Sequence, residues 1–215
     1  MGQNDPKFLE QCRVALDNVS KQPEIQELMN AVGYGPEVIA EGKAIWNDTR
    51  QAYDRNQMEG FESSEASQDF QLQRKDLTAY FRRDRGLAKV AFRYDGPTAA
   101  RIGVAEGVPK AYQKWVETVR KFYINSLADP AVMERLARLG VSEERLQQGA
   151  SMLRSVEEAR SRYLKEEGES QDATKIKDAA MERLEDWMKD FYAVAKVALR
   201  ARPQLAESLG KLVKS

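Results

Sequence analysis

The sequence predicts an all-α protein built from two tandem copies of one helical unit. When the chain is aligned with itself at an offset of 107 residues, residues 8–103 match residues 115–210 without a gap, and 22 of these 96 positions are identical. Average composition gives roughly six identities by chance. Apolar residues recur every three or four positions, as on one face of a helix. The 13 Gly and 7 Pro residues stand apart from one another, as punctuation between helices does.

The first two helices of each copy have clear boundaries. The first helix is predicted over residues 7–21 and again over residues 109–127, with apolar side chains on one face. The second is short and begins at Pro23 or Pro130, because proline suits the first turn of a helix. Gly33 and Gly140 end it, since a glycine commonly takes the left-handed conformation after a helix.

The longer helices come next. A third helix of about 24 residues, the length that its apolar stripe covers, begins at Pro36 or after Ser142, and polar loops follow at 60–65 and 168–172. The fourth is predicted over 68–94 and 174–201, and a last turn from Pro97 or Pro203 closes at Gly103 or Gly210. Short loops make neighbouring helices antiparallel. We therefore expect two four-helix bundles, residues 1–106 and 107–215, related by a pseudo-twofold axis and joined by residues 104–110. The alternative is one fused bundle in which both copies share a core.

Composition excludes several kinds of chemistry. The chain has no histidine and a single cysteine, so imidazole-based catalysis, a disulfide within the chain and a multi-cysteine zinc site are excluded. Cys12 shares a helical stripe with Leu9, Leu16 and Val19, which indicates a buried, inert thiol. No phosphate-binding loop or dinucleotide motif is present. We expect no catalytic residue, no bound metal and no cofactor.

Charge and hydropathy also limit the partners. The 34 basic and 34 acidic side chains balance, whereas nucleic-acid-binding proteins usually carry a basic excess. No apolar run approaches the 18 or so residues that a membrane span needs. Residues 1–6 are polar and do not resemble a secretory signal. We expect a cytoplasmic protein without dedicated nucleic-acid binding and without membrane insertion.

One difference between the copies points to a candidate site. The fourth helix of the second copy carries Phe191 in its apolar stripe, and the first copy has Asp84 at that position. A carboxylate in a core position must be paired or solvated. Asp84 therefore either pairs structurally with a neighbouring group or lines a polar ligand pocket. Basic residues surround it in the sequence, and the candidate ligand-binding set is Asp84, Arg82, Arg83, Arg85 and Lys89.

Two further features are shared by both copies. Gly42 and Gly149 lie inside the third helix, where glycine costs about 1 kcal/mol relative to alanine. Close crossing of two helices explains them best, and room for a ligand is the alternative. The motif Ala-Lys-Val-Ala-x-Arg, at 88–93 and 195–200, places small residues on one face for helix packing.

The segment with Trp187-Met-Lys-Asp-Phe191, Ala195-Lys-Val-Ala-Leu199, Pro203-Gln-Leu205 and Leu209-Gly210 resembles a C-terminal signature of uncharacterised bacterial helical proteins. The resemblance covers about 25 residues, transfers no site residue and implies a small bacterial protein of the cytoplasm. The leading prediction is a non-enzymatic helical scaffold or protein-interaction module with a protein partner or self-association. The alternative is a protein that binds a small molecule or phosphate near Asp84.

Overall fold

The computed structural model describes residues 5–210, and within that range it contains eight α-helices and no strand. The all-α prediction is confirmed. The helices are α1 (Asp5–Lys21), α2 (Pro23–Asn30), α3 (Pro36–Ala91), α4 (Gly96–Arg101), α5 (Tyr112–Leu127), α6 (Pro130–Ala137), α7 (Glu143–Ala198) and α8 (Pro203–Glu207). Residues 1–4, on which part of the prediction for the N-terminus depends, lie outside the described residues. Over residues 5–210, no helix is both long enough and apolar enough to cross a membrane.

The predicted helix ends recur in both copies. Positions equivalent at the offset of 107 begin and end α2 and α6, and the same holds for α3 and α7. Four glycines have a positive φ: Gly33 (88°), Gly103 (72°), Gly140 (79°) and Gly210 (77°). This backbone conformation is nearly free for glycine and costly for residues with a Cβ. These glycines end short helical segments, as the sequence predicts.

The polar loops predicted at 60–65 and 168–172 do not exist. The third and fourth predicted helices form one continuous helix of 56 residues in each copy, α3 and α7. The prediction failed because these segments lack an apolar stripe. Ser, Glu, Gln and Ala are compatible with a solvated helix, and no proline interrupts residues 37–91 or 143–198. The single glycines Gly60 and Gly168 cost only about 1 kcal/mol each.

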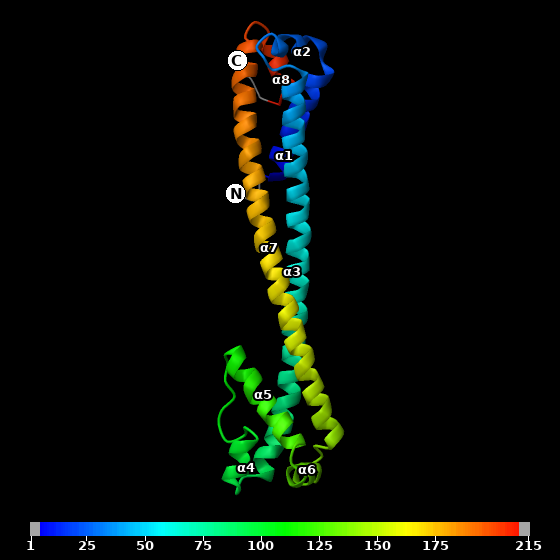
Figure 1. Ribbon diagram of the computed structural model, residues 1–215, viewed down its shortest axis with the longest axis vertical. Coiled ribbons are helices and arrows are strands. Elements are labelled where there is room, and N and C mark those ends of the chain that lie inside the picture. Colours follow the sequence, from blue (N-terminus) through cyan, green and yellow to red (C-terminus); the bar gives the residue numbers. More distant parts are fainter. Residues whose placement is uncertain (1–4, 211–215) are drawn as a thin grey trace. The chain divides into compact units, whose positions relative to one another are not determined.

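The helices form two compact units that do not coincide with the two copies. Unit 1 comprises Met1–Phe61 and Gly168–Ser215, and unit 2 comprises Glu62–Glu167. In unit 1, α1, α2 and α8 gather around the N-terminal part of α3 and the C-terminal part of α7 (Figure 1). In unit 2, α4, α5 and α6 gather around the remaining parts of the two long helices.

Each unit has its own hydrophobic core, and each core contains both copies. The core of unit 1 joins Leu9, Ile25 and Ile39 to Leu184 and Phe191. The core of unit 2 has the same mixed origin, with Leu77, Phe81, Ile102, Val119, Leu146 and Val156 among its members. The prediction that each copy forms a separate bundle is therefore wrong. Both copies contribute to each core, as the alternative of one fused bundle supposed, but the chain has two such cores and not one.

Within each unit the segments of α3 and α7 pack antiparallel. In unit 1, Thr49 Oγ1 donates to the carbonyl oxygen of Ala180 at 3.1 Å, and Asn56 Nδ2 donates to Thr174 Oγ1 at 2.8 Å. In unit 2, the rings of Phe70 and Tyr163 stack with their centroids 6.0 Å apart. The contacts made by Thr49 and Asn56 are polar, whereas Phe70 is a buried member of the core of unit 2.

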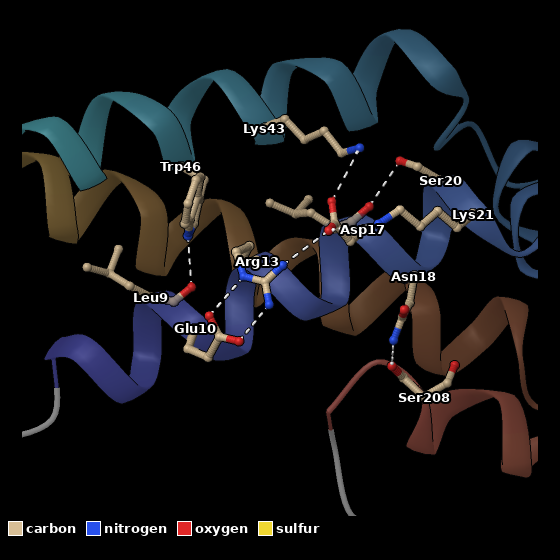
Figure 2. A network of polar contacts seen from close by, with 11 residues as sticks. Leu9, Glu10, Arg13, Asp17, Asn18, Ser20, Lys21, Lys43, Trp46 and Ser208 are labelled. Atoms are coloured by element: carbon tan, nitrogen blue, oxygen red, sulfur yellow. Dashed lines mark hydrogen bonds and ion pairs between the residues drawn. The ribbon is translucent and has the colours of Figure 1, made fainter.

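A polar network holds α1 to its neighbours in unit 1 (Figure 2). Trp46 Nε1 of α3 donates to the carbonyl oxygen of Leu9 at 2.8 Å, and Asn18 Nδ2 donates to the carbonyl oxygen of Ser208. The carboxylate of Asp17 lies between two cations: its Oδ2 is 3.3 Å from Arg13 Nη1, and its Oδ1 is 3.8 Å from Lys43 Nζ. The indole and amide contacts fix the position of α1 relative to α3 and α8. The exposed ion pairs contribute little to stability.

Candidate functional site

Asp84 lies in the interior of unit 2, as its equivalence to Phe191 predicts. It follows Leu77 and Phe81 on the buried stripe of α3 and precedes Ala88, at helical spacing. All four side chains are fully or almost fully buried, and the exposed fraction of Asp84 is 0%. The α3 segment therefore carries a carboxylate into a hydrophobic core, where a lone charge costs several kcal/mol.

Two neighbouring helices supply partners to this carboxylate. Arg145 of α7 donates from Nε to Asp84 Oδ1 at 2.5 Å, and Tyr123 of α5 donates from Oη to Asp84 Oδ2 at 3.2 Å. The guanidinium of Arg145 also lies 3.9 Å from the ring centroid of Tyr80, whose hydroxyl donates to the carbonyl oxygen of Arg145 at 3.2 Å. Both carboxylate oxygens are thus bound by the chain itself. The prediction that Asp84 contacts a cationic or hydrogen-bonding group of another helix is confirmed.

Burial and pairing act in opposite directions on the Asp84 carboxyl. Burial raises its pKa, and the hydrogen bond and charge of Arg145 lower it, with burial the larger effect. Burial lowers the pKa of the Arg145 guanidinium, but its hydrogen bond to Asp84 and the charge of that group leave the pKa raised. Burial also raises the pKa of the Tyr123 hydroxyl, and the neighbouring Asp84 raises it further. Tyr123 therefore stays protonated and acts as a donor.

Arg85 is buried next to Asp84 in the sequence but serves another part of the chain. Its exposed fraction is 8%, and its Nη2 donates to the carbonyl oxygens of Val104, at 3.3 Å, and Glu106. Its Nε has no hydrogen-bond partner in the described structure. Burial lowers the pKa of this guanidinium. Arg85 thus holds residues 104–106, the segment that leads from one copy to the next.

The other predicted ligand-binding residues do not converge on Asp84. The side chains of Arg82, Arg83 and Lys89 are exposed, whereas Asp84 is enclosed. Arg83 reaches Asp84 only through its charge, which makes a small contribution to lowering the pKa of the carboxyl. Of the five predicted residues, the structure therefore places one inside the core cluster, one against residues 104–106 and three in solvent.

Sequence reasoning missed Arg145 and Tyr123, although a signal for them exists. At the offset of 107, Arg145 corresponds to Val38 and Tyr123 corresponds to Leu16. Asp84, Tyr123 and Arg145 together form the Asp84 cluster. Phe191, Val38 and Leu16 are apolar, so each member of this cluster is polar where the other copy has an apolar residue. A search of both copies for positions that change together from apolar to polar would have found the cluster.

Gly42 and Gly149 make room for aromatic rings of the chain itself. A Cβ at Gly149 would collide with the ring of Tyr123, and a Cβ at Gly42 would collide with the ring of Trp187. Each glycine thus lies where a neighbouring helix packs closely, through the aromatic ring that this helix carries. The same ring of Tyr123 that rests on Gly149 carries the hydroxyl that binds Asp84. Gly149 is therefore part of the support of the Asp84 cluster.

Hollows on the surface lie elsewhere. In unit 2, one of about 480 Å³ is lined by Glu62, Glu65 and Asp69 with Arg162 and Glu166, and one of about 330 Å³ follows α5 from Glu117 to Asn125. In unit 1, a hollow of about 220 Å³ lies between α1, α2 and the start of α3, near Tyr34 and Lys43. Asp84 lines none of these three.

The chain matches no protein-family model, no curated protein and no solved structure.

The arrangement has the chemistry of a structural cluster. The carboxylate has two donors and no open position for a substrate, and the nearby hydroxyl is held protonated. Cys12, a possible nucleophile, is buried in unit 1, where burial raises the pKa of its thiol to about 12. At that pKa almost none of the thiol is ionised near neutral pH, and the thiolate is the reactive form.

Proposed function

We propose that the protein is a non-enzymatic helical scaffold or interaction module that binds another protein through exposed apolar side chains. The observation that carries this proposal is their recurrence. Val90 and Val197 occupy equivalent positions and are 57% and 68% exposed, and Val32 and Leu139, also equivalent, are 43% and 38% exposed. Single exposed apolar residues are ordinary, but their retention in two copies that differ at most positions calls for a reason.

Because of this recurrence, each unit carries an equivalent pair of exposed apolar side chains. Unit 1 carries Val32 and Val197, and unit 2 carries Leu139 and Val90. Because each unit carries one such pair, a partner with two equivalent binding surfaces would suit this chain. A lysine, Lys89 or Lys196, precedes each valine of the shared motif and is exposed. Each valine is therefore an apolar side chain beside a charged one, and a partner that covers the valine would remove it from water.

The Asp84 cluster does not support the alternative function, binding of a small molecule or phosphate near Asp84. A ligand-binding carboxylate must exchange its partners for the ligand, and here that would leave Arg145 and Tyr123 without theirs. The bound geometry favours structural pairing of Asp84. A small-molecule or phosphate ligand remains an outcome that the following experiment detects.

The test compares two matched pairs of substitutions in the full chain. Val90→Ser with Val197→Ser removes recurring apolar side chains. Leu72→Ser with Ile176→Ser removes side chains of similar exposure, 57% and 55%, whose equivalents in the other copy are Ala179 and Asp69. The immobilised proteins are incubated with an extract of the source cell, and bound proteins are quantified by mass spectrometry.

We expect one protein to bind the unsubstituted chain and to lose at least about tenfold in recovery with the valine pair. A fully buried valine contributes about 1.5 kcal/mol or more to binding, and 1.4 kcal/mol corresponds to a factor of ten. The Leu72 and Ile176 pair should bind normally. Equal loss in both pairs would show nonspecific adhesion. A ligand seen by native mass spectrometry and removed by Asp84→Asn would favour the alternative.

A further inference from the structure

Neither copy of the repeat contains a complete core. In unit 1 the apolar faces of α1, α2 and the first part of α3 are covered by Leu184, Phe191 and Leu209 of the second copy. In unit 2 the apolar face of α5 and the first part of α7 is covered by Leu77 and Phe81 of the first copy. Separation of the copies would expose both faces to water. Each copy therefore acts toward the other as a protein partner does.

One hydrogen bond is made twice between the copies, with the roles reversed. Asn18 of the first copy donates to the carbonyl oxygen of Ser208 in the second copy. Asn125, the equivalent of Asn18, donates at 2.6 Å to the carbonyl oxygen of Arg101, the equivalent of Ser208. Reciprocal contacts of this kind characterise the interface of a twofold dimer, in which residue i of each subunit contacts residue j of the other.

The covalent connection between the copies is short, and its first residue, Val104, is buried in the core of unit 2. Residues 104–111 lie between α4 and α5 and form no regular helix. Their anchors include Arg85, through the carbonyl oxygens of Val104 and Glu106, and the backbone bond from Val104 N to the oxygen of Ala99 at 2.9 Å. The guanidinium of Arg85 donates hydrogen bonds to these two carbonyl oxygens. No carboxylate is among its hydrogen-bond partners in the described structure.

We propose that the protein is a fused dimer whose two copies are complementary docking partners, and that a second copy of this chain fits the same interface by exchange. In the exchanged dimer, residues 5–103 of one chain pair with residues 112–210 of the other, and the reverse pairing completes the second half. Exchange of identical elements is a low-cost route to dimers, and the connecting segment decides between closed and exchanged forms. This inference does not depend on the exposed valines of the proposed function.

The first experiment cuts the connection in the full chain. A protease site replaces residues 105–108, and the protein is cleaved after folding. We expect the fragments to elute together at the size of the uncut protein and to keep its helical circular dichroism. Thermal unfolding should become dependent on concentration only after cleavage, with a lower midpoint at each tenfold dilution, because the reaction is then bimolecular.

Three outcomes would overturn the inference. The fragments could elute separately as folded proteins, they could separate and unfold at micromolar concentration, or the cleaved protein could melt independently of concentration. Exchange is tested directly by incubating a mixture of two differently tagged cleaved proteins under native conditions. Half of the complexes should come to carry one fragment from each source, and retention of the original pairs alone would contradict exchange.

The second experiment uses the uncut chain. Arg85→Met removes the anchor of residues 104–106, and we expect the fraction of dimer after refolding at high concentration to increase severalfold. Arg82→Met, an exposed arginine on the same helix, is the matched control and should refold like the unsubstituted chain. If Arg85→Met fails to fold, insertion of four glycines after Glu106 tests the connection in the opposite direction, because a longer connection favours closure within one chain and should lower the dimer fraction. An unchanged dimer fraction in the foldable variant would refute the role of the connection.

Discussion

The contribution of the Asp84 cluster to stability can be tested by substitutions taken from the other copy of the repeat. Equivalent positions in the other copy are apolar, so the cluster can be replaced by the residues of that copy, two of which, Leu16 and Phe191, lie in the core of unit 1. The variant combines three changes, Asp84→Phe, Tyr123→Leu and Arg145→Val, taken from Phe191, Leu16 and Val38. Phenylalanine is larger than aspartate and leucine is smaller than tyrosine, so the total volume changes little, as core substitutions require.

The expected free energies follow from burial and pairing. Arg145→Val alone leaves Asp84, with an exposed fraction of 0%, without its cationic partner. Removal of one member of a buried pair costs about 3–5 kcal/mol. Tyr123→Phe removes one hydrogen bond of 3.2 Å and should cost about 1–3 kcal/mol, since the acceptor stays buried. The triple variant leaves no unpaired polar group and should lie within about 1 kcal/mol of the unsubstituted protein or exceed its stability.

The assay is denaturant unfolding followed by circular dichroism near neutral pH. The decisive comparison is the triple variant against Arg145→Val. If the triple variant loses as much stability as the single one, the cluster does more than compensate a buried charge, and the reasoning is refuted. Unchanged stability of Arg145→Val would refute it from the other side, because Asp84 would then have solvent or another cation as a partner.

The pH dependence of Arg145→Val checks the cause of its destabilisation. Burial already raises the pKa of Asp84, and removal of the opposing guanidinium raises it further. The folded state then holds a proton that the unfolded chain releases above about pH 4. The penalty of Arg145→Val, measured against the unsubstituted protein, should therefore be smallest below the folded-state pKa that Asp84 has in the unsubstituted protein, which burial already raises. From there it should grow by about 1.4 kcal/mol per pH unit up to the higher folded-state pKa of the variant. A penalty independent of pH would indicate lost packing instead.

Gly149→Ala should destabilise the protein by about 1–3 kcal/mol, because the added Cβ collides with the ring of Tyr123. Gly168→Ala should stabilise the protein by up to about 1 kcal/mol, because the space around Gly168 is open and alanine favours the helix. Calorimetry measures both effects. Cys12 should resist an alkylating reagent near pH 8 in the folded protein and react at once in denaturant, since burial raises its thiol pKa to about 12; rapid native labelling would contradict the buried position. Ser64→Pro should cost about 3 kcal/mol or more and reduce helicity, because residue 64 lies inside α3; a neutral effect would restore the predicted loop.

The local sequence determined the ends of the helices. Proline at positions 23, 36, 130 and 203 and glycine at positions 33, 103, 140 and 210 act through backbone sterics, which depend on nearest neighbours alone. The same holds for the interior position of Asp84, because its helical stripe and its equivalence to Phe191 are both visible in the sequence. The sequence pattern thus determined the ends of the short helices and the buried position of residue 84, but not the continuity of α3 and α7.

Tertiary structure decided which copy completes which core. The stretches around Gly60 and Gly168 have no apolar stripe, and propensity cannot distinguish a solvated helix from a polar loop. Once these stretches are helical, α3 and α7 continue past them, and each of their ends meets the short helices of a unit that contains both copies. The partners of Asp84 follow from that arrangement. Tyr123 and Arg145 lie 39 and 61 residues away in the chain, and burial of apolar surface, which is indifferent to sequence distance, brought them together.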